Sequence, residues 1–386
     1  MKDVVMIGHL AQEHSLQYCK IDEENKGKPS CFEMEIELNG KYYAYGFECI
    51  LNESKIISEW LVQLNASKDT IIFERDVNLS TFKSKFDNNF IKAFKQGIDG
   101  NDNVLFLNEM NRNKDGFYKE NKETRIFKDI FKWFKNNLDI NMRDRSLLGY
   151  SYLIEDESFE EITKLLKLFG TGISTFKLEE ISEAQINKQL PDEIHKLIEK
   201  RIYEIKNTSQ KQEQKEVINF YLNKCFYSVE FNILDDDVLC KKLKFIHANS
   251  SSLFEVFEES DGTIVLLGLL EILLTKERDK VFVIDDIDKC LHPNLTYKFI
   301  QTFLKYLEDR NIQLITTSNE LKIMDLKLLR RDEIGFVKKD ENGESIIFSL
   351  DEFNPHFDQI LSKAYLDGRY GAVPEFGSFD LDFDED

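Results

Sequence analysis

A two-lobed α/β fold with a helical insertion is predicted for this 386-residue chain by three patterns. The run Val281–Ile284 is rich in β-branched and aromatic residues, which is typical of a strand buried on both faces of a parallel sheet. Strict alternation over 32–38, followed by Asn39-Gly40, predicts an antiparallel hairpin. Residues 79–239 have few glycines and a helical pattern rich in Phe, Lys and Glu. We therefore expect a mixed or parallel sheet, an antiparallel β-lobe and inserted helices.

These patterns predict three domains. Residues 1–78 form an antiparallel β-lobe, in which Met1–Tyr18 is helix-like and the strands 42–50, 56–64 and 70–74 continue the meander. Residues 79–240 form a helical insertion, and residues 241–386 form the C-terminal lobe.

Two details of the insertion follow from the same pattern. Phe127, Phe131 and Phe134 lie on one helix face, which indicates a packing surface. Residues 183–225 are expected to form two helices around a polar segment. The glycines in 167–174 lack a following GK[ST], so they do not form a phosphate loop.

The C-terminal lobe places acidic residues at the end of a buried strand. Glu259–Thr263 opens an apolar helix over 264–274, and Val281–Ile284 then runs into Asp285, Asp286 and Asp288. A helix over 294–307 and a second buried strand over 313–318 follow. Ligands bind at the carboxyl ends of the strands in open α/β sheets, and an exposed helix N-terminus attracts anions. These residues therefore predict a site for a phosphate and a metal ion.

Composition narrows the classes of function. The net charge of −20 argues against a broad surface that coats nucleic acid, although a local contact stays open. The six cysteines are scattered without CxxC pairs, so we expect reduced thiols. No apolar run approaches the ~20 residues of a membrane span, and the N-terminus lacks a signal peptide pattern. A cytoplasmic protein is expected.

At this point the chain resembles the ABC/SMC-like AAA-type ATPases of the bacterial abortive-infection (OLD-like) phage-defence family. Residues 281–293 resemble the Walker B strand and D-loop of that family, 259–263 resemble its signature motif and 314–320 resemble its switch strand. The segments 328–340 and 364–374 are similar to its closing segments. The resemblance implies a two-lobed P-loop ATPase core.

The resemblance also implies ATP and Mg²⁺ as ligands and assigns roles to residues. Asp285 would hold the metal, Asp286 would orient the attacking water, and Asn319 would contact the γ-phosphate. The other nucleotide-binding residues that it implies are Ser260, Gly262, Asp288 and His292. Homo- or hetero-oligomers would form through the signature and Walker B face, with an effector nuclease as a partner.

Three departures from the family pattern stand in the sequence. No GxxxxGK[ST] occurs in the 386 residues, and we expect the chain to begin just after the segment that carries this motif. Asp286 stands where the family has Glu, and Asn319 stands where it usually has His. The chain alone is therefore expected to bind Mg-ATP weakly and to turn it over at background.

Two other functions stay open. A degenerate pseudo-ATPase, or an N-terminally truncated fragment, would keep the fold in a structural or regulatory role. A metal-dependent nuclease would instead hold its ion with Asp285, Asp286 and Asp288.

Overall fold

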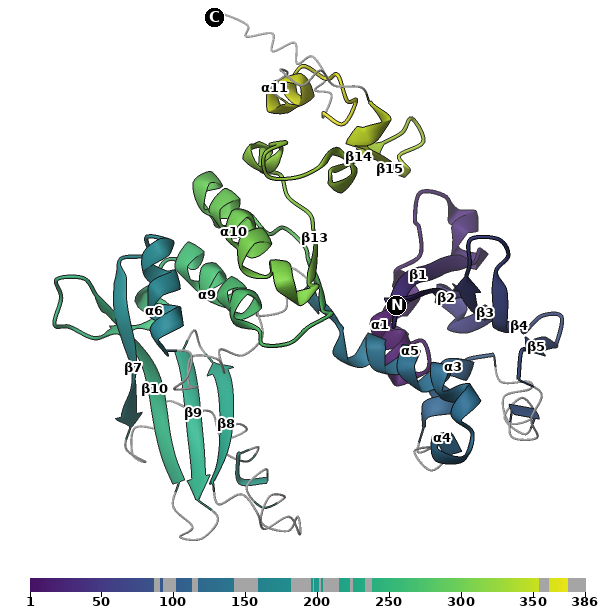
Figure 1. Ribbon diagram of the computed structural model, residues 1–386, viewed down its shortest axis with the longest axis horizontal. Coiled ribbons are helices and arrows are strands. Elements are labelled where there is room, and N and C mark those ends of the chain that lie inside the picture. Colours follow the sequence, from purple (N-terminus) through teal and green to yellow (C-terminus); the bar gives the residue numbers. More distant parts are fainter. Residues whose placement is uncertain are drawn as a thin grey trace, which may run out of the picture. The chain divides into compact units, whose positions relative to one another are not determined.

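A computed structural model of the protein describes residues 1–86, 91–92, 102–112, 117–141, 159–181, 196, 198–200, 203, 215–222, 225–232, 238–353 and 361–373. The chain divides into two compact units (Figure 1). The first unit comprises 1–139, 335–349 and 370–386, and the second comprises 140–334 and 350–369. Each is described by itself.

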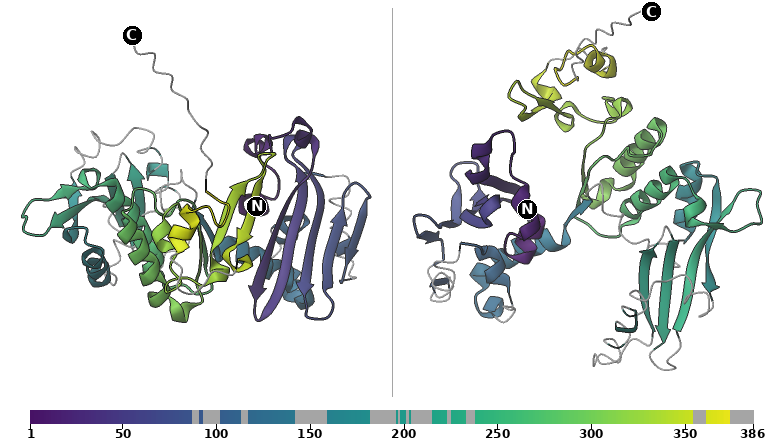
Figure 2. Two further views of the ribbon diagram at one scale, coloured as in Figure 1. Left: turned by 90° about the horizontal axis from the view of Figure 1, so that it is seen from above. Right: turned by 180° about the vertical axis from the view of Figure 1, so that it is seen from behind.

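A five-stranded antiparallel sheet in sequence order forms the base of the first unit (Figure 2). Its strands are β1 (Ser30–Leu38), β2 (Lys41–Ile50), β3 (Lys55–Leu64), β4 (Thr70–Asp76) and β5 (Thr81–Ser84). Asn39 and Gly40 both have positive φ, at 54° and 71°, as a tight two-residue hairpin turn requires. The predicted meander is confirmed, and Glu33, Glu35 and Glu37 face solvent as expected.

The helices of the first unit are α1 (Lys2–Ile7), α3 (Phe106–Asn111), α4 (Phe117–Glu120) and α5 (Arg125–Asn136), with 3-10 helices at Gln12–Leu16, Glu23–Gly27, Leu51–Glu53 and Lys122–Thr124. Aromatic contacts place α3 and α5 against the five-stranded sheet. The ring of Phe73 on β4 lies 4.9 Å from that of Phe106 and 5.8 Å from that of Phe127. Phe134 meets Tyr45 of β2 edge-on. The aromatic stripe of α5 is therefore a packing face, as predicted.

The hairpin of β14 (Gly335–Lys339) and β15 (Ser345–Ser349) also belongs to the first unit. Its Phe336 ring stacks on Tyr370 with centroids 5.3 Å apart. Burial of this aromatic pair ties the hairpin to the last described turn of the chain.

The described residues of the second unit form two sheets and three longer helices. An antiparallel sheet pairs β7 (Ile173–Ile181), β8 (Lys215–Leu222), β9 (Cys225–Asn232), β10 (Val238–His247) and β11 (Phe254–Glu255). A smaller sheet has the order β13-β12-β6 and comprises β6 (Leu138–Asn141), β12 (Val281–Ile284) and β13 (Gln313–Thr316). The division between the units falls within β6, after Asp139. The helices are α6 (Phe159–Leu168), α9 (Asp261–Leu274), α10 (Pro293–Tyr306) and the short α11 (Leu361–Leu366). The 3-10 helices are Val256–Glu258, Glu308–Arg310, Leu321–Ile323, Arg331–Glu333 and Leu350–Glu352.

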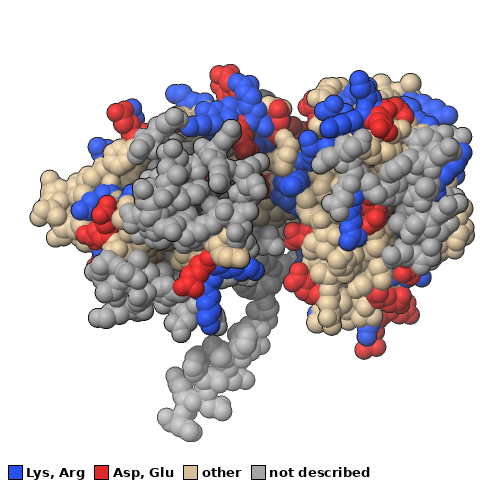
Figure 3. All heavy atoms as spheres, turned by 90° about the horizontal axis from the view of Figure 1, so that it is seen from below, with Lys and Arg blue, Asp and Glu red and all other residues tan. Residues whose placement is uncertain are grey.

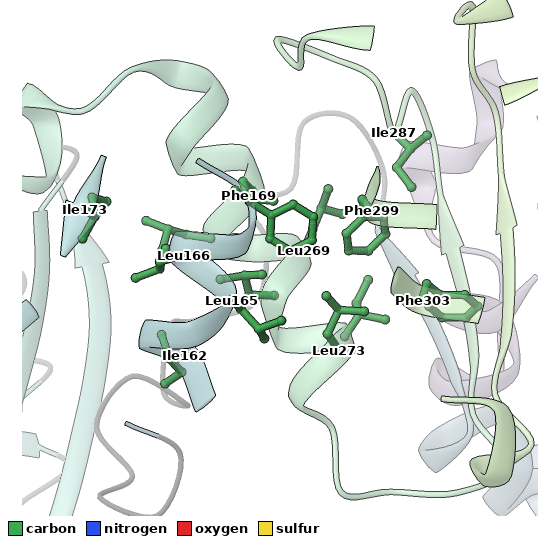
Figure 4. Packing of buried hydrophobic residues seen from close by; sticks show 14 of the residues in the cluster. Ile162, Leu165, Leu166, Phe169, Ile173, Leu269, Leu273, Ile287, Phe299 and Phe303 are labelled. Carbon is green, nitrogen blue, oxygen red and sulfur yellow. The ribbon is translucent and has the colours of Figure 1, made fainter. Parts of the chain in front are cut away.

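One hydrophobic core joins these elements (Figure 4). Leu269 and Leu273 of α9 pack toward Phe299 and Phe303 of α10, and Ile287 from the loop after β12 enters the same core. The helix α9 is buried almost all round, as its apolar run predicts. This core fixes the ends of α9, β12 and α10, from which the candidate site is built.

The expected pairing of these two strands is confirmed, but the expected burial of both is wrong in part. β12 alternates half-buried and buried residues, whereas β13 alternates exposed and half-buried ones, with Ile315 49% exposed, because β13 is the edge strand of its sheet. β12 and β13 run parallel, with Val281 opposite Gln313 and Ile284 opposite Thr316. A mixed α/β fold with a parallel sheet and antiparallel sheets is therefore present.

The helical character expected throughout 79–240 is wrong in part. α3, α4, α5 and α6 are helices, but β7, β8 and β9 are strands, and β8 and β9 pair as a hairpin where a helix was expected. The physical reason is in the sequence, since 217–231 is rich in aromatic and β-branched residues, which favour strands. Part of the expected helix pair in 183–225 lies outside the described residues. The boundaries at 79 and 240 remain predictions.

Candidate functional site

The carboxyl ends of β12 and β13 bring the acidic residues beside the switch segment. Asp285 and Asp286 follow the last residue of β12, and Asp285 is exposed while Asp286 is half-buried. Asp286 has a φ of 53°, so the chain turns sharply at that residue. The main-chain N–H of Lys289 donates to the carbonyl of Asp286 at 2.9 Å. A compact turn therefore presents the carboxylates at the sheet edge.

Residues after β13 hold this turn from the other side. The Thr317 hydroxyl donates to Oδ1 of Asp285 at 2.5 Å and accepts the main-chain N–H of Asp286 at 2.8 Å. The main-chain N–H of Asn319 donates to Oδ1 of Asp288 at 3.2 Å. The structure therefore places Asp285 and Asp286 beside Thr317, and Asp288 beside Asn319, while their roles in binding remain predictions.

The start of α9 forms the second part of the candidate site. Ser260 is the N-cap, and its hydroxyl accepts the main-chain N–H of Thr263 at 3.1 Å. The helix has 14 residues, so its N–H groups and dipole concentrate positive potential at this end. Ser260 and Asp261 are exposed. The predicted helix start is confirmed at the level of local structure.

Gly262 lies against the loop that follows β12. A β-carbon on residue 262 would come within 2.7 Å of the carbonyl oxygen of Cys290, which is closer than side chains approach a backbone oxygen. Glycine is therefore required there by a tertiary contact. The predicted signature segment and the predicted D-loop touch within one chain.

A second contact holds the residue before the cap. His247 Nε2, at the end of β10, lies 2.7 Å from Oε1 of Glu259, whose side chain is 5% exposed. The imidazole meets the Phe254 ring edge-on at 4.7 Å, and Gly172 lies against its Nδ1. Because a buried carboxylate needs hydrogen bonds, this pair anchors the entry to α9 on the antiparallel sheet.

His292 has a structural partner in addition to its predicted role. It is the N-cap of α10, and its Nδ1 accepts the main-chain N–H of Asn294 at 3.1 Å. This bond fixes the ring through an unprotonated Nδ1 and leaves Nε2 as its other polar atom.

The donor set suits a metal ion that arrives with a nucleotide. Among the described residues, no three His, Cys, Asp or Glu side chains are grouped so that they could hold an ion. Magnesium is usually bound by one or two carboxylates, with water and substrate phosphates completing the shell. Asp285, exposed at the strand end, fits that arrangement.

The face drawn in Figure 3 carries both basic and acidic side chains of the described residues. No helix within the described ranges combines the length and hydropathy needed to cross a bilayer.

Sequence reasoning did not predict the contacts of four residues that support the site: Thr317, Cys290, His247 and Glu259. Their contacts join residues that are distant in the sequence. His247 and Glu259 are 12 positions apart, and Thr317 and Asp285 are 32 positions apart. Thr317, directly after β13, carried a local signal, because a polar residue at the carboxyl end of a parallel strand can face the end of the neighbouring strand.

Comparison with known proteins identifies the family. The sequence profile of a family described as "AAA domain, putative AbiEii toxin, Type IV TA system" matches residues 10–325, a span that includes α9, β12, α10 and β13. No curated protein matches the chain. The mixed α/β architecture is consistent with the P-loop AAA-domain fold. Since the match covers more than half of the 386 residues, the chain belongs to this family of ABC-like AAA ATPase domains, which is associated with abortive infection and toxin–antitoxin systems.

Proposed function

We propose that this chain is an ATP-binding subunit of an ABC/SMC-like ATPase in a bacterial anti-phage, OLD-like abortive-infection system. In this proposal nucleotide-dependent dimerisation is coupled to an effector, for which a nuclease is the candidate. The observation that carries the proposal is the shared edge at which Asp285 and Asp286 meet the residues after β13. The family match supports it, because AAA domains imply nucleotide binding.

The nucleotide would be held between two chains. Asp285 of one chain would hold the Mg²⁺ that accompanies ATP, and Asp288 and His292 would line the same side. Ser260 and Gly262 of the other chain would cap the γ-phosphate through the start of α9. When bound, the ion neutralises charge on the β- and γ-phosphates. The contact between Gly262 and Cys290 supports this arrangement, because within each chain it joins the start of α9 to the loop after β12 in one continuous surface.

Two residues limit the chemistry that this chain can perform. Asp286 would orient the attacking water, but its side chain is one methylene shorter than the Glu that the family resemblance implies. A displacement of about 1 Å costs on the order of 10²-fold in rate. Asn319 would contact the γ-phosphate through its amide but cannot change its charge near neutral pH. These two residues favour a pseudo-ATPase with a structural or regulatory role as the second candidate.

Association measured by light scattering tests the interface. ATP with Mg²⁺ should increase association of the wild-type chain with a family member that carries GxxxxGK[ST], and Ser260→Arg should weaken it. Ser251→Arg is the matched control, because Ser251 is an exposed serine in the same unit, outside α9. Association that is the same with and without ATP, or the same in wild type and Ser260→Arg, would contradict the proposed interface.

Nucleotide titration separates the two candidate functions. Binding of Mg-ATP and its hydrolysis should be measured for the chain with and without a family-like N-terminal segment that carries the phosphate loop. Binding is expected to improve first, and Asp285→Ala should then reduce it. Binding without turnover would favour the pseudo-ATPase. Robust hydrolysis by the isolated chain, abolished by Asp285→Ala, would contradict the expectation of background activity.

A further inference from the structure

We propose that Thr317 is a positioning residue that fixes the Asp285 carboxylate for a Mg²⁺–nucleotide ligand. This inference rests on the proposed function and deepens it. Asp285, not Thr317, would touch the ion. The role belongs to the hydroxyl group of Thr317, which lies between the ends of two parallel strands.

The two hydrogen bonds of this hydroxyl determine its orientation. A threonine hydroxyl has one proton to donate and lone pairs to accept with. The main-chain N–H of Asp286 donates to Thr317 Oγ1 at 2.8 Å, and Oγ1 lies 2.5 Å from Oδ1 of Asp285, which can only accept while ionised. The proton is therefore directed at Asp285. This bond engages Oδ1, so Oδ2 would be the oxygen that is left to hold a cation.

The backbone of Thr317 is itself held in place. Its N–H donates to the carbonyl of Ile284 at 3.1 Å, and its carbonyl accepts the N–H of Ile287 at 3.1 Å. Ile287 is 1% exposed and packs in the core of the second unit. The backbone hydrogen bonds of Thr317 therefore extend the pairing of β12 with β13 and fix the position of its hydroxyl, even though the side chain is exposed.

This arrangement restrains two features of the proposed site together. Asp285 is exposed, so without the bond its carboxylate would sample other rotamers before an ion arrived. Asp286 has a left-handed backbone, and the bond from its N–H to Thr317 holds that turn closed. Residues that orient a metal ligand typically contribute 10- to 100-fold to metal affinity or activity.

Thr316 supplies a matched control. Its hydroxyl also bonds across the same two strands, donating to the carbonyl of Ile284 at 2.9 Å, but it contacts no carboxylate among the described residues. Thr316→Val and Thr317→Val therefore remove the same group from adjacent positions. If the hydroxyl of Thr317 had only a structural role, the two variants would have similar Mg²⁺ midpoints.

The experiment is a Mg²⁺ titration of a fluorescent ATP analogue bound to the full chain, with a parallel measurement in EDTA. Thr317→Val should raise the Mg²⁺ concentration at half-saturation by about tenfold or more. Its affinity for the metal-free nucleotide and its midpoint temperature of thermal unfolding should stay near the wild-type values. Thr317→Ser, which keeps the hydroxyl, should restore the wild-type midpoint, and Thr316→Val should leave it unchanged.

Other outcomes overturn the inference in distinguishable ways. If wild type shows Mg²⁺-dependent binding and Thr317→Val shows the same midpoint, the positioning role is wrong while the proposed function stands. The same conclusion follows if Thr317→Val weakens metal-free binding equally, or if Thr317→Ser fails to restore the midpoint. If wild-type binding does not depend on Mg²⁺, both the proposed metal site and the role of Thr317 are wrong.

Discussion

The carbonyl oxygen of Cys290 occupies the space that a side chain on Gly262 would need. A β-carbon at residue 262 would lie 2.7 Å from this oxygen. Residue 262 belongs to the first turn of α9, and residue 290 belongs to the loop between β12 and α10. A change at the helix start must therefore displace the loop that carries Asp288.

We predict that Gly262→Ala shifts this loop and weakens ATP-dependent association. The clash is with backbone, which cannot rotate away as a flexible side chain can, so overpacking should lower the free energy of unfolding by about 1–3 kcal/mol. Gly27→Ala is the control, because a β-carbon there meets no atom within 4 Å. Light scattering with ATP and urea denaturation measure the two effects. Wild-type association by Gly262→Ala would show that the loop position does not matter for the interface.

A second prediction concerns Glu59, a fully buried carboxylate on β3. It accepts hydrogen bonds from the Tyr45 hydroxyl at 3.0 Å and from the main-chain N–H groups of Phe106 and Leu107 at 2.6 and 2.9 Å. Nη1 of Arg75 lies 3.9 Å from Oε2 of Glu59. Burial raises the pKa of Glu59 above its ordinary value of 4.5, although these donors and Arg75 oppose the shift.

Because the folded-state pKa of Glu59 is raised, its contribution to stability is largest below pH 4.5 and is lost as pH rises through the folded-state pKa. Glu59→Gln should destabilise the first unit by about 1–3 kcal/mol. Both oxygens of Glu59 accept hydrogen bonds, so the NH₂ group of a glutamine would face a donor and leave it unsatisfied. The difference in unfolding free energy between wild type and Glu59→Gln should therefore shrink with rising pH. Urea denaturation at a series of pH values, from below 4.5 upward, measures this difference. Glu37→Gln, at an exposed position, controls for the loss of charge. A difference that grows with pH would contradict the raised pKa.

The sequence predicts those parts of the fold that depend on local patterns. The apolar runs of α9 and β12, the Ser260 cap and the Asn39-Gly40 turn all carry their signal within a few residues. β8 and β9 were missed, although their aromatic and β-branched residues favour strands, because the neighbouring polar segment suggested a helix pair.

Contacts between distant segments could not be predicted in the same way. Thr317 meets Asp285 only because β12 and β13 pair in one register, and Glu59 is buried only because the start of α3 folds onto β3. A glutamate in an alternating strand has no local feature that distinguishes a buried acceptor from a solvent-facing charge. Tertiary packing decides which it becomes.

A third prediction tests the pairing of His247 with Glu259. The two atoms lie 2.7 Å apart and Glu259 is nearly buried, so removing either partner leaves a polar group without its hydrogen bond. In a double-mutant cycle, His247→Ala and Glu259→Ala should each cost about 1–3 kcal/mol, and the double variant should cost less than their sum. Urea denaturation of the four proteins gives the coupling energy. Additive losses would show that the two residues stabilise the start of α9 independently.

The last prediction concerns the length of the side chain at position 286. The left-handed φ of 53° suits Asp, whereas a longer Glu adopts this conformation at a cost of about 1 kcal/mol. A glutamate would nevertheless extend the carboxylate toward the water that it is proposed to orient. We expect Asp286→Glu to raise ATP turnover by up to about 10²-fold over its parent, when both carry an added phosphate-loop segment.

Two measurements separate this rate effect from a change in folding or binding. Asp286→Asn keeps the backbone preference but lacks the carboxylate, so it should bind Mg-ATP and leave turnover at background. Asp286→Glu should show its gain in single-turnover hydrolysis, with an affinity for nucleotide within about threefold of its parent. If Asp286→Glu and Asp286→Asn hydrolyse ATP at the same rate, the carboxylate at this position does not orient the water, and the loss of one methylene is not what limits turnover.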